Sequence, residues 1–333
     1  MEQNDPDFTN NIYRKDYKKR AGLFFFLLMI IEIPMAVGVG IVQSFFSADK
    51  GTLISVLMTQ GYLLLAAFIY IFATGTRLNE DLGIKKYRLP SFFLSLILLI
   101  CASPMANWLN IISQFFVKNR TSKAVFEITE NVPAWLGVII IGCLPGFVEE
   151  TIYRGIIYSA FRRYSVMVGV IISALSFGLM HLNFNQMLYA IYLGTIFALL
   201  VEATGSLLST MILHMLFNTV NTIYLYMLPI LLNVLSQFGI EEAGMSIDEI
   251  IDKTPTNAEL MSALMLFTPM AVVGLFLTVL LLKKIAQIKG REITWKSVCE
   301  KQDVSTDKGP LNVWLILGWI ICLIFSVINT MKM

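Results

Sequence analysis

The stretch GVIIIGCLPGFVEETIYRGIIYSAF, residues 137–161, is apolar over a length that can cross a bilayer, yet it carries three charges near its middle. A membrane-spanning helix needs about 20 apolar residues at a rise of about 1.5 Å per residue. Glu149, Glu150 and Arg154 are therefore expected within lipid or packed protein. Ionisable residues inside a span are rare and costly, so all three are functional candidates.

The composition of the whole chain agrees with a membrane setting for this stretch. Of the 333 residues, 56% are hydrophobic and 14% are charged, and the mean hydropathy is +0.71. Soluble domains carry about 25% charged residues. The chain is therefore expected to be an all-α, polytopic transmembrane bundle of about eight or nine spans with a central polar cavity. We expect the chain to be embedded in a lipid bilayer. The net charge of +2 does not indicate a nucleic-acid partner.

Nine apolar stretches have the length or the setting of spans. They lie near 21–46, 52–74, 90–110, 133–161, 166–182, 186–202, 206–235, 259–282 and 311–329. The fifth and sixth are short, whereas the fourth and seventh are long. This inequality predicts that some helices protrude from the bundle and that others end in the protein interior.

The distribution of lysine and arginine predicts the orientation, because cytoplasmic loops are enriched in both. With the N-terminus inside, 18 of the 25 basic residues fall in the N-terminal tail, the 75–89 loop, the turn at 162–163 and the segment 283–308. We therefore expect an integral protein of the plasma membrane with a cytoplasmic N-terminus. The predicted organisation is a tail (1–20), a bundle (21–282), a basic cytoplasmic linker (283–310) and a final transmembrane helix (311–333).

The two histidines of the chain, His181 and His214, both lie in apolar segments. If the chain folds as a helical hairpin near Ser165, Glu149 and His181 are each 16 residues from the turn, which is about 24 Å along a helix. His214 lies nine residues past Gly205, about 14 Å from the next turn on that side. If the first hairpin projects about 10 Å further into the cytoplasm, these distances bring the three side chains to one depth.

Residues four apart share a helix face, which adds three more groups to this set. Glu150 can pair with Arg154, and Asn218 can point to the same side as His214. Phe177 precedes His181 at the same spacing. We therefore predict a site formed by Glu149, Glu150, Arg154, His181, His214 and Asn218.

Several chemistries are open to this set. A carboxylate beside an imidazole can deprotonate water, and the second histidine with Asn218 can donate hydrogen bonds to an oxyanion. Alternatively, Glu149, His181 and His214 could ligate a catalytic zinc ion, with the other glutamate as the base. The same groups could serve a proton-coupled transporter, and a non-enzymatic immunity protein that sequesters a peptide is a further alternative.

The order E-E-x-x-x-R (Glu149 to Arg154), F-x-x-x-H (Phe177 to His181) and H-x-x-x-N (His214 to Asn218) resembles the three motifs of the CPBP family. This family comprises CAAX prenyl proteases and bacteriocin-processing enzymes, also called Abi proteins. The resemblance covers about residues 130–225, which would be the catalytic core of the bundle.

The resemblance implies an intramembrane endopeptidase built around a cavity that is open to the cytoplasm and the membrane. By motif position, Glu149 would activate water with help from His181, and His214 and Asn218 would form the oxyanion side. Glu150 and Arg154 would support and orient Glu149. Members are described both as metalloproteases and as metal-free glutamate proteases, so zinc stays open and no cofactor is certain. The implied substrate is a prenylated, lipidated or hydrophobic peptide, and the implied roles are peptide maturation and bacteriocin self-immunity.

Overall fold

All regular structure in the described part of the chain is helical. The computed structural model describes residues 17–46, 48–119, 121–238, 249, 253–301 and 309–331. Its helices are α2 (Tyr17–Gln43), α3 (Ala48–Thr74), α4 (Leu89–Gln114), α5 (Thr121–Asn131), α6 (Ala134–Gly137), η1 (Val138–Cys143), α7 (Leu144–Glu150), η2 (Thr151–Tyr158), α8 (Ser159–Phe161), α9 (Val166–Met180), α10 (Phe184–Thr204), α11 (Leu207–Gln237), α13 (Asn257–Ile288), α14 (Trp295–Cys299) and α15 (Val313–Met331). The predicted all-α bundle is confirmed.

Eight of the helical segments are long and apolar enough to cross a membrane, and the segment from α6 to α8 counts as one of them, at 28 residues. The fifth predicted span, near 166–182, corresponds to α9, which has 15 residues and is about 22 Å long. The predicted difference in length between the helices is therefore observed. The first helix starts at Tyr17, so the predicted boundary at residue 20 falls inside a helix, whereas residues 1–16 lie outside the described ranges.

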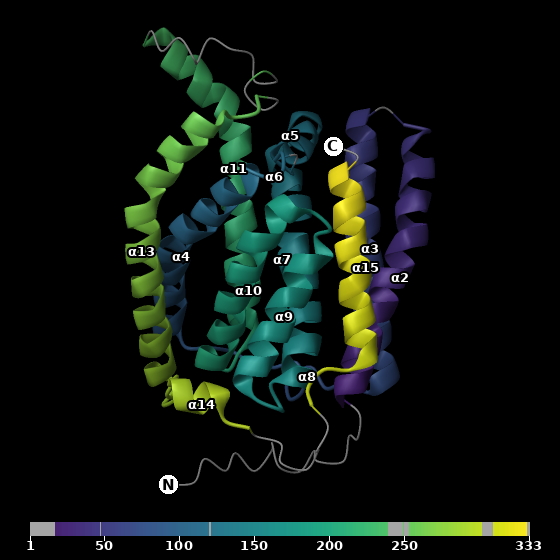
Figure 1. Ribbon diagram of the computed structural model, residues 1–333, viewed down its shortest axis with the longest axis vertical. Coiled ribbons are helices and arrows are strands. Elements are labelled where there is room, and N and C mark those ends of the chain that lie inside the picture. Colours follow the sequence, from purple (N-terminus) through teal and green to yellow (C-terminus); the bar gives the residue numbers. More distant parts are fainter. Residues whose placement is uncertain are drawn as a thin grey trace.

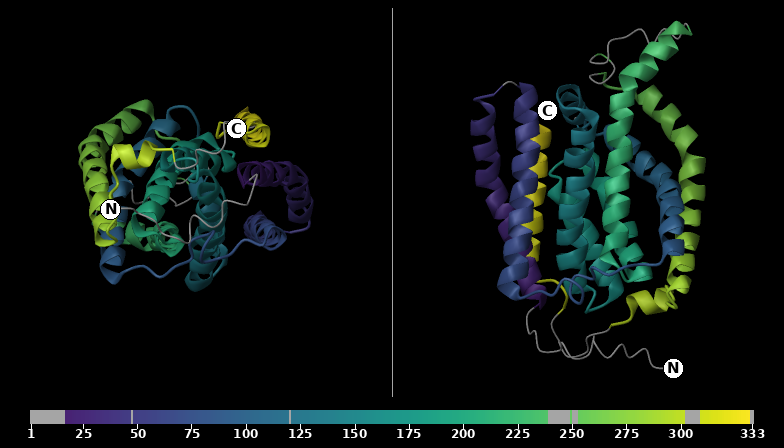
Figure 2. Two further views of the ribbon diagram at one scale, coloured as in Figure 1. Left: turned by 90° about the horizontal axis from the view of Figure 1, so that it is seen from below. Right: turned by 180° about the vertical axis from the view of Figure 1, so that it is seen from behind.

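The helices run side by side, with the start of α2 and the end of α15 at opposite ends of the bundle (Figure 1). One flank consists of α4 and α13, and the other of α2, α3 and α15, with α7, α9, α10 and α11 between them (Figure 2). The helix α15 packs on α2 and α9, and the indole Nε1 of Trp319 donates to Ser176 at 2.9 Å. The final predicted span therefore belongs to the bundle.

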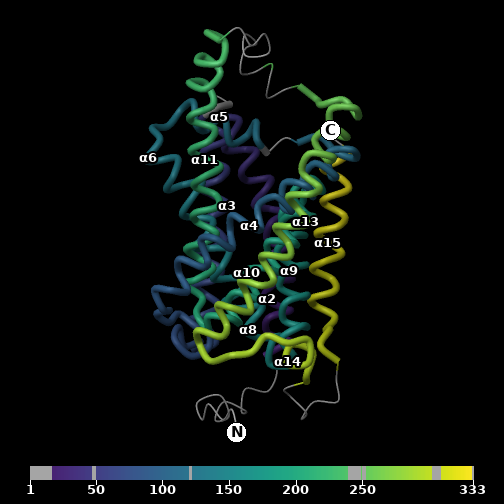
Figure 3. Tube along the Cα trace, turned by 90° about the vertical axis from the view of Figure 1, so that its left-hand side faces the viewer, coloured from purple at the N-terminus to yellow at the C-terminus, as the bar shows by residue number. Residues whose placement is uncertain are grey.

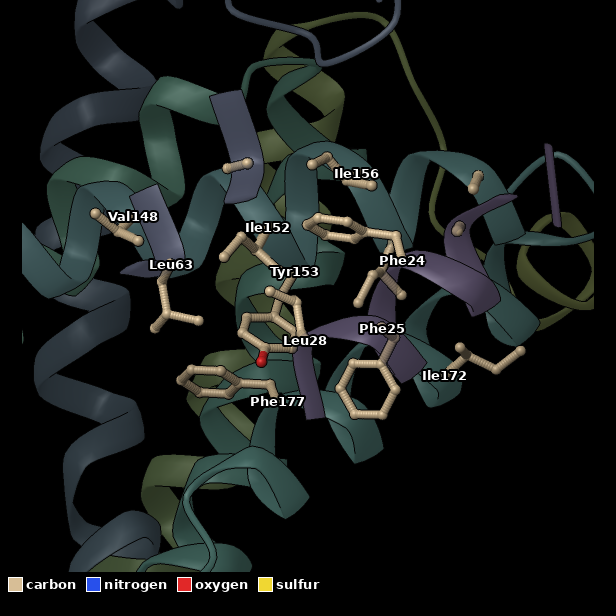
Figure 4. Packing of buried hydrophobic residues seen from close by; sticks show 14 of the residues in the cluster. Phe24, Phe25, Leu28, Leu63, Val148, Ile152, Tyr153, Ile156, Ile172 and Phe177 are labelled. Carbon is tan, nitrogen blue, oxygen red and sulfur yellow. The ribbon is translucent and has the colours of Figure 1, made fainter. Parts of the chain in front are cut away.

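The main apolar core lies between the central helices and α2 (Figure 4). Tyr153 of η2 is fully buried there, and the centroid of its ring lies 5.2 Å from that of Phe177. Because η1 and η2 have π-helical turns on both sides of α7, the fourth span departs from a regular α-helix where its charged residues lie. Turns of this type are frequent at functional sites.

Gly146 allows α7 to approach α11 closely. A Cβ atom at this position would lie 2.7 Å from the backbone nitrogen of Met215. Small residues let membrane helices pack with their backbones in near contact. This approach brings Glu149 and Glu150, one turn further along α7, next to His214 of α11.

Candidate active site

The six predicted site residues come from four neighbouring elements and meet within the bundle. Glu149 and Glu150 end α7, Arg154 lies in η2, His181 follows α9, and His214 and Asn218 belong to α11. A cavity of about 550 Å³ is lined by four of them: Glu149, His181, His214 and Asn218. The side chains of Glu150 and Arg154 lie behind the cavity wall with 0% exposure.

His214 connects the two glutamates. Its Nδ1 atom lies 2.9 Å from Oε1 of Glu150, and its Nε2 atom lies 3.8 Å from Oε2 of Glu149. A carboxylate paired with arginine only accepts hydrogen bonds, so the Nδ1–H group of His214 donates to Glu150. The Nε2 atom is thereby directed at Glu149 and at the cavity.

Glu150 and Arg154 form a buried ion pair, with 2.9 Å between Oε1 and Nη1. The guanidinium group of Arg154 also lies over the rings of Phe177 and Phe197, at 4.4 and 5.5 Å from their centroids. Buried charges need such partners, because desolvation is costly. Glu150 of this pair contacts His214 directly. The pair therefore positions Glu149 indirectly, through the imidazole of His214.

The position of Arg154 depends on a glycine in α10. A Cβ atom on Gly194 would lie 3.0 Å from Nη2 of Arg154 and 3.1 Å from Cα of Ala174. Such contacts are tighter than most real Cβ contacts, so a larger residue would push the guanidinium group or the helix away. Gly194 therefore makes room for the buried arginine.

His181 stands at the point where the chain reverses between α9 and α10. Its Nδ1 atom lies 2.8 Å from the carbonyl oxygen of Phe177. Because a carbonyl only accepts, Nδ1 carries the proton, and Nε2 of the neutral ring is an acceptor. Leu182 follows with a φ of 50°, which is rare for a residue other than glycine and is often found at functional sites.

The structure pairs Glu149 with a different histidine from the one that the hairpin spacing indicated. Among the described residues, the imidazole within 4 Å of the Glu149 carboxylate is that of His214, and His181 faces it across the same cavity. The reason is that Gly146 brings α7 close to α11, an approach that helix spacing alone does not predict.

Gln60 is a site residue that the motif analysis missed. Its Nε2 atom donates to Oε1 of Glu149 at 3.4 Å, and its side chain lines the cavity. It belongs to α3, outside the region of the three motifs. The sequence does contain one indication of this role, because Gln60 is a carboxamide within the apolar stretch 52–74.

Carboxamide side chains are the common feature of the cavity wall. One of them, Asn185, donates to Asn110 at 2.8 Å and to Ser113 at 2.7 Å, and it thereby fixes the start of α10 against α4. Among these carboxamides, Asn218 is the one that belongs to the three motifs. The full set of carboxamides is Gln60, Asn107, Asn110, Asn119, Asn185, Gln186, Asn218 and Asn221.

The three candidate zinc ligands do not form a metal-binding group in this conformation. Within the described ranges, no group of three or more histidine, cysteine, aspartate or glutamate side chains is arranged to hold an ion. The Nδ1 atoms of His214 and His181 contact Glu150 and the Phe177 carbonyl, which leaves their Nε2 atoms as the available ligand atoms. These atoms are not gathered with Glu149 into one group, so the three residues do not fit a three-ligand zinc site as they stand among the described residues.

Comparison with known proteins agrees with the geometry. No curated protein and no solved structure matches the chain. Residues 131–220 match the model of a family described as Type II CAAX prenyl endopeptidase Rce1-like. The matched region contains α7, α9, α10 and the part of α11 that holds His214 and Asn218. Over these 90 of its 333 residues the protein is similar to the Rce1-like CAAX prenyl endopeptidase family, as the resemblance of its three motifs indicated.

Proposed function

We propose that this protein is an endopeptidase that hydrolyses a peptide bond in a hydrophobic or lipidated substrate, with water activated by Glu149. The contact between Glu149 and His214 on the wall of a polar cavity carries this proposal. It is supported by the family match over the same helices. The proposed roles are peptide maturation and bacteriocin self-immunity.

The net charge of the buried groups is compatible with Glu149 as a general base. Glu149 and Glu150 bring two negative charges and Arg154 brings one positive charge, so one further proton makes the cluster neutral. With that proton on His214, Glu149 is a carboxylate and Nε2–H of His214 is a donor. A buried cluster without net charge avoids the large cost of an uncompensated charge.

The first chemical step is the attack of water on the scissile carbonyl. Glu149 accepts one proton of a water molecule, and the oxygen of that water forms a bond to the carbonyl carbon. The Nε2 atom of His181, left as an acceptor by its Nδ1–H bond to Phe177, holds the second proton of the water. Glu149 and His181 thus orient the nucleophile from two sides.

The carbonyl oxygen becomes an oxyanion as the water adds. Asn218 lies one helical turn beyond His214 on α11 and lines the same cavity, so its amide can donate to this oxygen. Nε2–H of His214 supplies a second donor. Donors held in place before the reaction stabilise the charge that develops in the transition state.

The tetrahedral intermediate collapses when the leaving nitrogen receives a proton. Glu149, protonated in the first step, donates it, and the carbon–nitrogen bond breaks. The products are a carboxylic acid and an amine, and Glu149 returns to its carboxylate form. One residue therefore acts first as base and then as acid.

The cavity wall suits a peptide backbone. A carboxamide offers a donor and an acceptor, as a peptide group does, so an extended chain can bond to several of them in sequence. Apolar side chains such as Ile141, Phe217 and Leu225 lie among the carboxamides and can contact the side chains of the substrate. A mixed lining of this kind is typical of binding cavities.

The test is a comparison of membrane and secreted peptides from cells that make the wild type, the Glu149→Gln variant or the His181→Ala variant. We expect one or more peptides to appear only with the wild type, and their uncleaved precursors to accumulate with both variants. Identical peptide sets, or immunity that survives the Glu149→Gln change, would contradict the proposal and would favour sequestration of a peptide.

A further inference from the structure

The cavity of the candidate active site lies toward one end of the bundle. Its lining comes from the first half of α3, the last third of α4, α5, the end of α9 and the first part of α10. In Figure 3 α5 is at one end of the bundle, whereas α8 and α14 are at the other end. The Glu149 and His214 side chains therefore form the floor of a space that extends toward α5 and away from α8 and α14.

A second hollow continues the cavity in the same direction. It has a volume of about 950 Å³ and is lined by the end of α4, by α5, by the middle of α11 and by the start of α13. Four residues line both spaces: Asn119, Ser122, Tyr224 and Leu225. The second hollow is thus the mouth of the cavity.

The opposite end of the bundle is closed beneath the site. Leu82, Ile156 and Leu207 are at most 3% exposed and belong to the main core. Two hydrogen bonds hold the loop before α4 against the start of α11. The backbone N–H of Leu207 donates to the carbonyl oxygen of Gly83 at 2.8 Å, and the Ser206 hydroxyl donates to the carbonyl oxygen of Lys85. None of the described residues that line the two spaces lies at this end, so we expect a substrate to reach Glu149 from the other end.

The closed end carries most of the basic residues. Two of them converge on Glu202 at the end of α10, with ion-pair distances of 2.7 Å to Arg162 and 3.6 Å to Arg291. The described basic residues at the open end are Lys50, Lys118, Lys123 and Lys253. Those at the closed end are Lys18, Lys19, Arg20, Arg77, Lys85, Lys86, Arg88, Arg162, Arg163, Lys283, Lys284, Lys289, Arg291, Lys296 and Lys301.

Basic loops stay on the cytoplasmic side of a membrane. We infer that the cavity opens to the extracytoplasmic face and that the substrate is a peptide segment presented from that face. The inference rests on the proposed function for the nature of the substrate. It departs from the resemblance, which implies a cavity open to the cytoplasm, and it disfavours a cytoplasmic prenylated C-terminus as the substrate.

Thiol labelling tests the opening without requiring turnover. The background replaces the half-buried Cys101 and Cys143 by alanine, and the exposed Cys299 of α14 reports on the closed end. A second variant reports on the mouth. It carries Ser122→Cys as the thiol to be labelled, and Cys299→Ala removes the exposed thiol of α14. Right-side-out and inverted membrane vesicles are treated with a membrane-impermeant maleimide.

We expect the Ser122→Cys variant to be labelled in right-side-out vesicles only, and Cys299 in inverted vesicles only. A Tyr224→Cys variant, which places the thiol on α11 at the same mouth, should behave like Ser122→Cys. Labelling of the mouth variants only in inverted vesicles, or in neither type, would overturn the inference.

A cleavage assay separates this inference from the proposed function. A hydrophobic peptide that the detergent-solubilised wild type cleaves is added outside each type of vesicle. Cleavage by right-side-out vesicles, and by inverted vesicles only after detergent is added, supports the inference. The reverse result overturns it. Loss of all cleavage, also in detergent, would instead contradict the proposed function, while the labelling pattern still decides the orientation.

Discussion

His214 is held by Glu150: the Nδ1 atom of the imidazole lies 2.9 Å from Oε1 of the carboxylate. The same oxygen accepts from Arg154, also at 2.9 Å. This chain of contacts fixes which nitrogen of His214 faces the cavity and therefore how it meets Glu149. In this account Glu150 and Arg154 are positioning residues, and Glu149, His181, His214 and Asn218 face the substrate.

Removal of Arg154 should destabilise the protein. The Arg154→Met change removes the arginine partner of Glu150, whose side chain has 0% exposure, and leaves it with His214 alone. Breaking a buried pair in this way costs about 3–5 kcal/mol. We expect a corresponding fall in the free energy of unfolding in detergent, measured by denaturant titration.

The matched control is Arg77→Met. Arg77 pairs with Glu80 at the surface, where the two side chains are 50% and 47% exposed. An exposed pair contributes about 0–1 kcal/mol. Equal losses of stability in the two variants would show that the buried pair has no special importance. The double variant Glu150→Gln, Arg154→Met should recover part of the lost stability, because no buried charge is then left unpaired.

The Gly194→Ala change should lower activity through Arg154. The added methyl group would lie 3.0 Å from Nη2 of Arg154, so the guanidinium group must shift, and Glu150 and His214 with it. We expect a lower kcat with little change in KM, measured on one peptide substrate. The Gly40→Ala variant is the control, because a Cβ atom there meets nothing within 4 Å. Equal kcat values in the two variants would contradict this role.

Much of the fold and part of the site could be predicted from the sequence. The apolar stretches predict the spans because lipid requires about 20 apolar residues per helix. The three motifs predict Glu149, Glu150, Arg154, His181, His214 and Asn218, since charged and polar groups are rare in such helices. The shortness of α9 was also visible as a short apolar run.

The contacts within the site could not be predicted in the same way. The pairing of Glu149 with His214 depends on how closely α7 approaches α11, which the Gly146 contact determines. Gln60 comes from α3, far from the motifs in sequence, so only the three-dimensional packing brings it to Glu149. The direction in which the cavity opens depends on which halves of the helices line it, and a list of spans does not contain this information.

Loss of the Gln60 amide should weaken catalysis modestly. Its Nε2 atom donates to Glu149 at 3.4 Å, and a hydrogen bond to a charged group contributes about 1.5–3 kcal/mol at good geometry. Because this contact is long, we expect Gln60→Leu to lower kcat by about tenfold, which corresponds to about 1.4 kcal/mol. The control is Gln114→Leu, whose side chain donates to its own helix at 3.4 Å. An unchanged kcat in Gln60→Leu would remove Gln60 from the account.

Chelation should leave activity unchanged. Among the described residues, Glu149, His181 and His214 do not form a three-ligand group. We therefore expect purified protein to keep its cleavage rate after treatment with a strong zinc chelator, and metal analysis to find no stoichiometric zinc. A loss of activity that added zinc restores would show that the side chains rearrange around a metal and would contradict the metal-free route.

The proposed mechanism depends above all on Glu149 as the base. General acid–base catalysis contributes about 10²- to 10⁴-fold to a rate. The measurement is the cleavage rate of one peptide by the purified Glu149→Gln variant, compared with a Glu32→Gln control that changes another glutamate within a predicted span. We predict a fall in kcat within that range for Glu149→Gln, an unchanged kcat for Glu32→Gln, and the same unfolding midpoint for both. A folded Glu149→Gln variant that cleaves at the wild-type rate would contradict the claim.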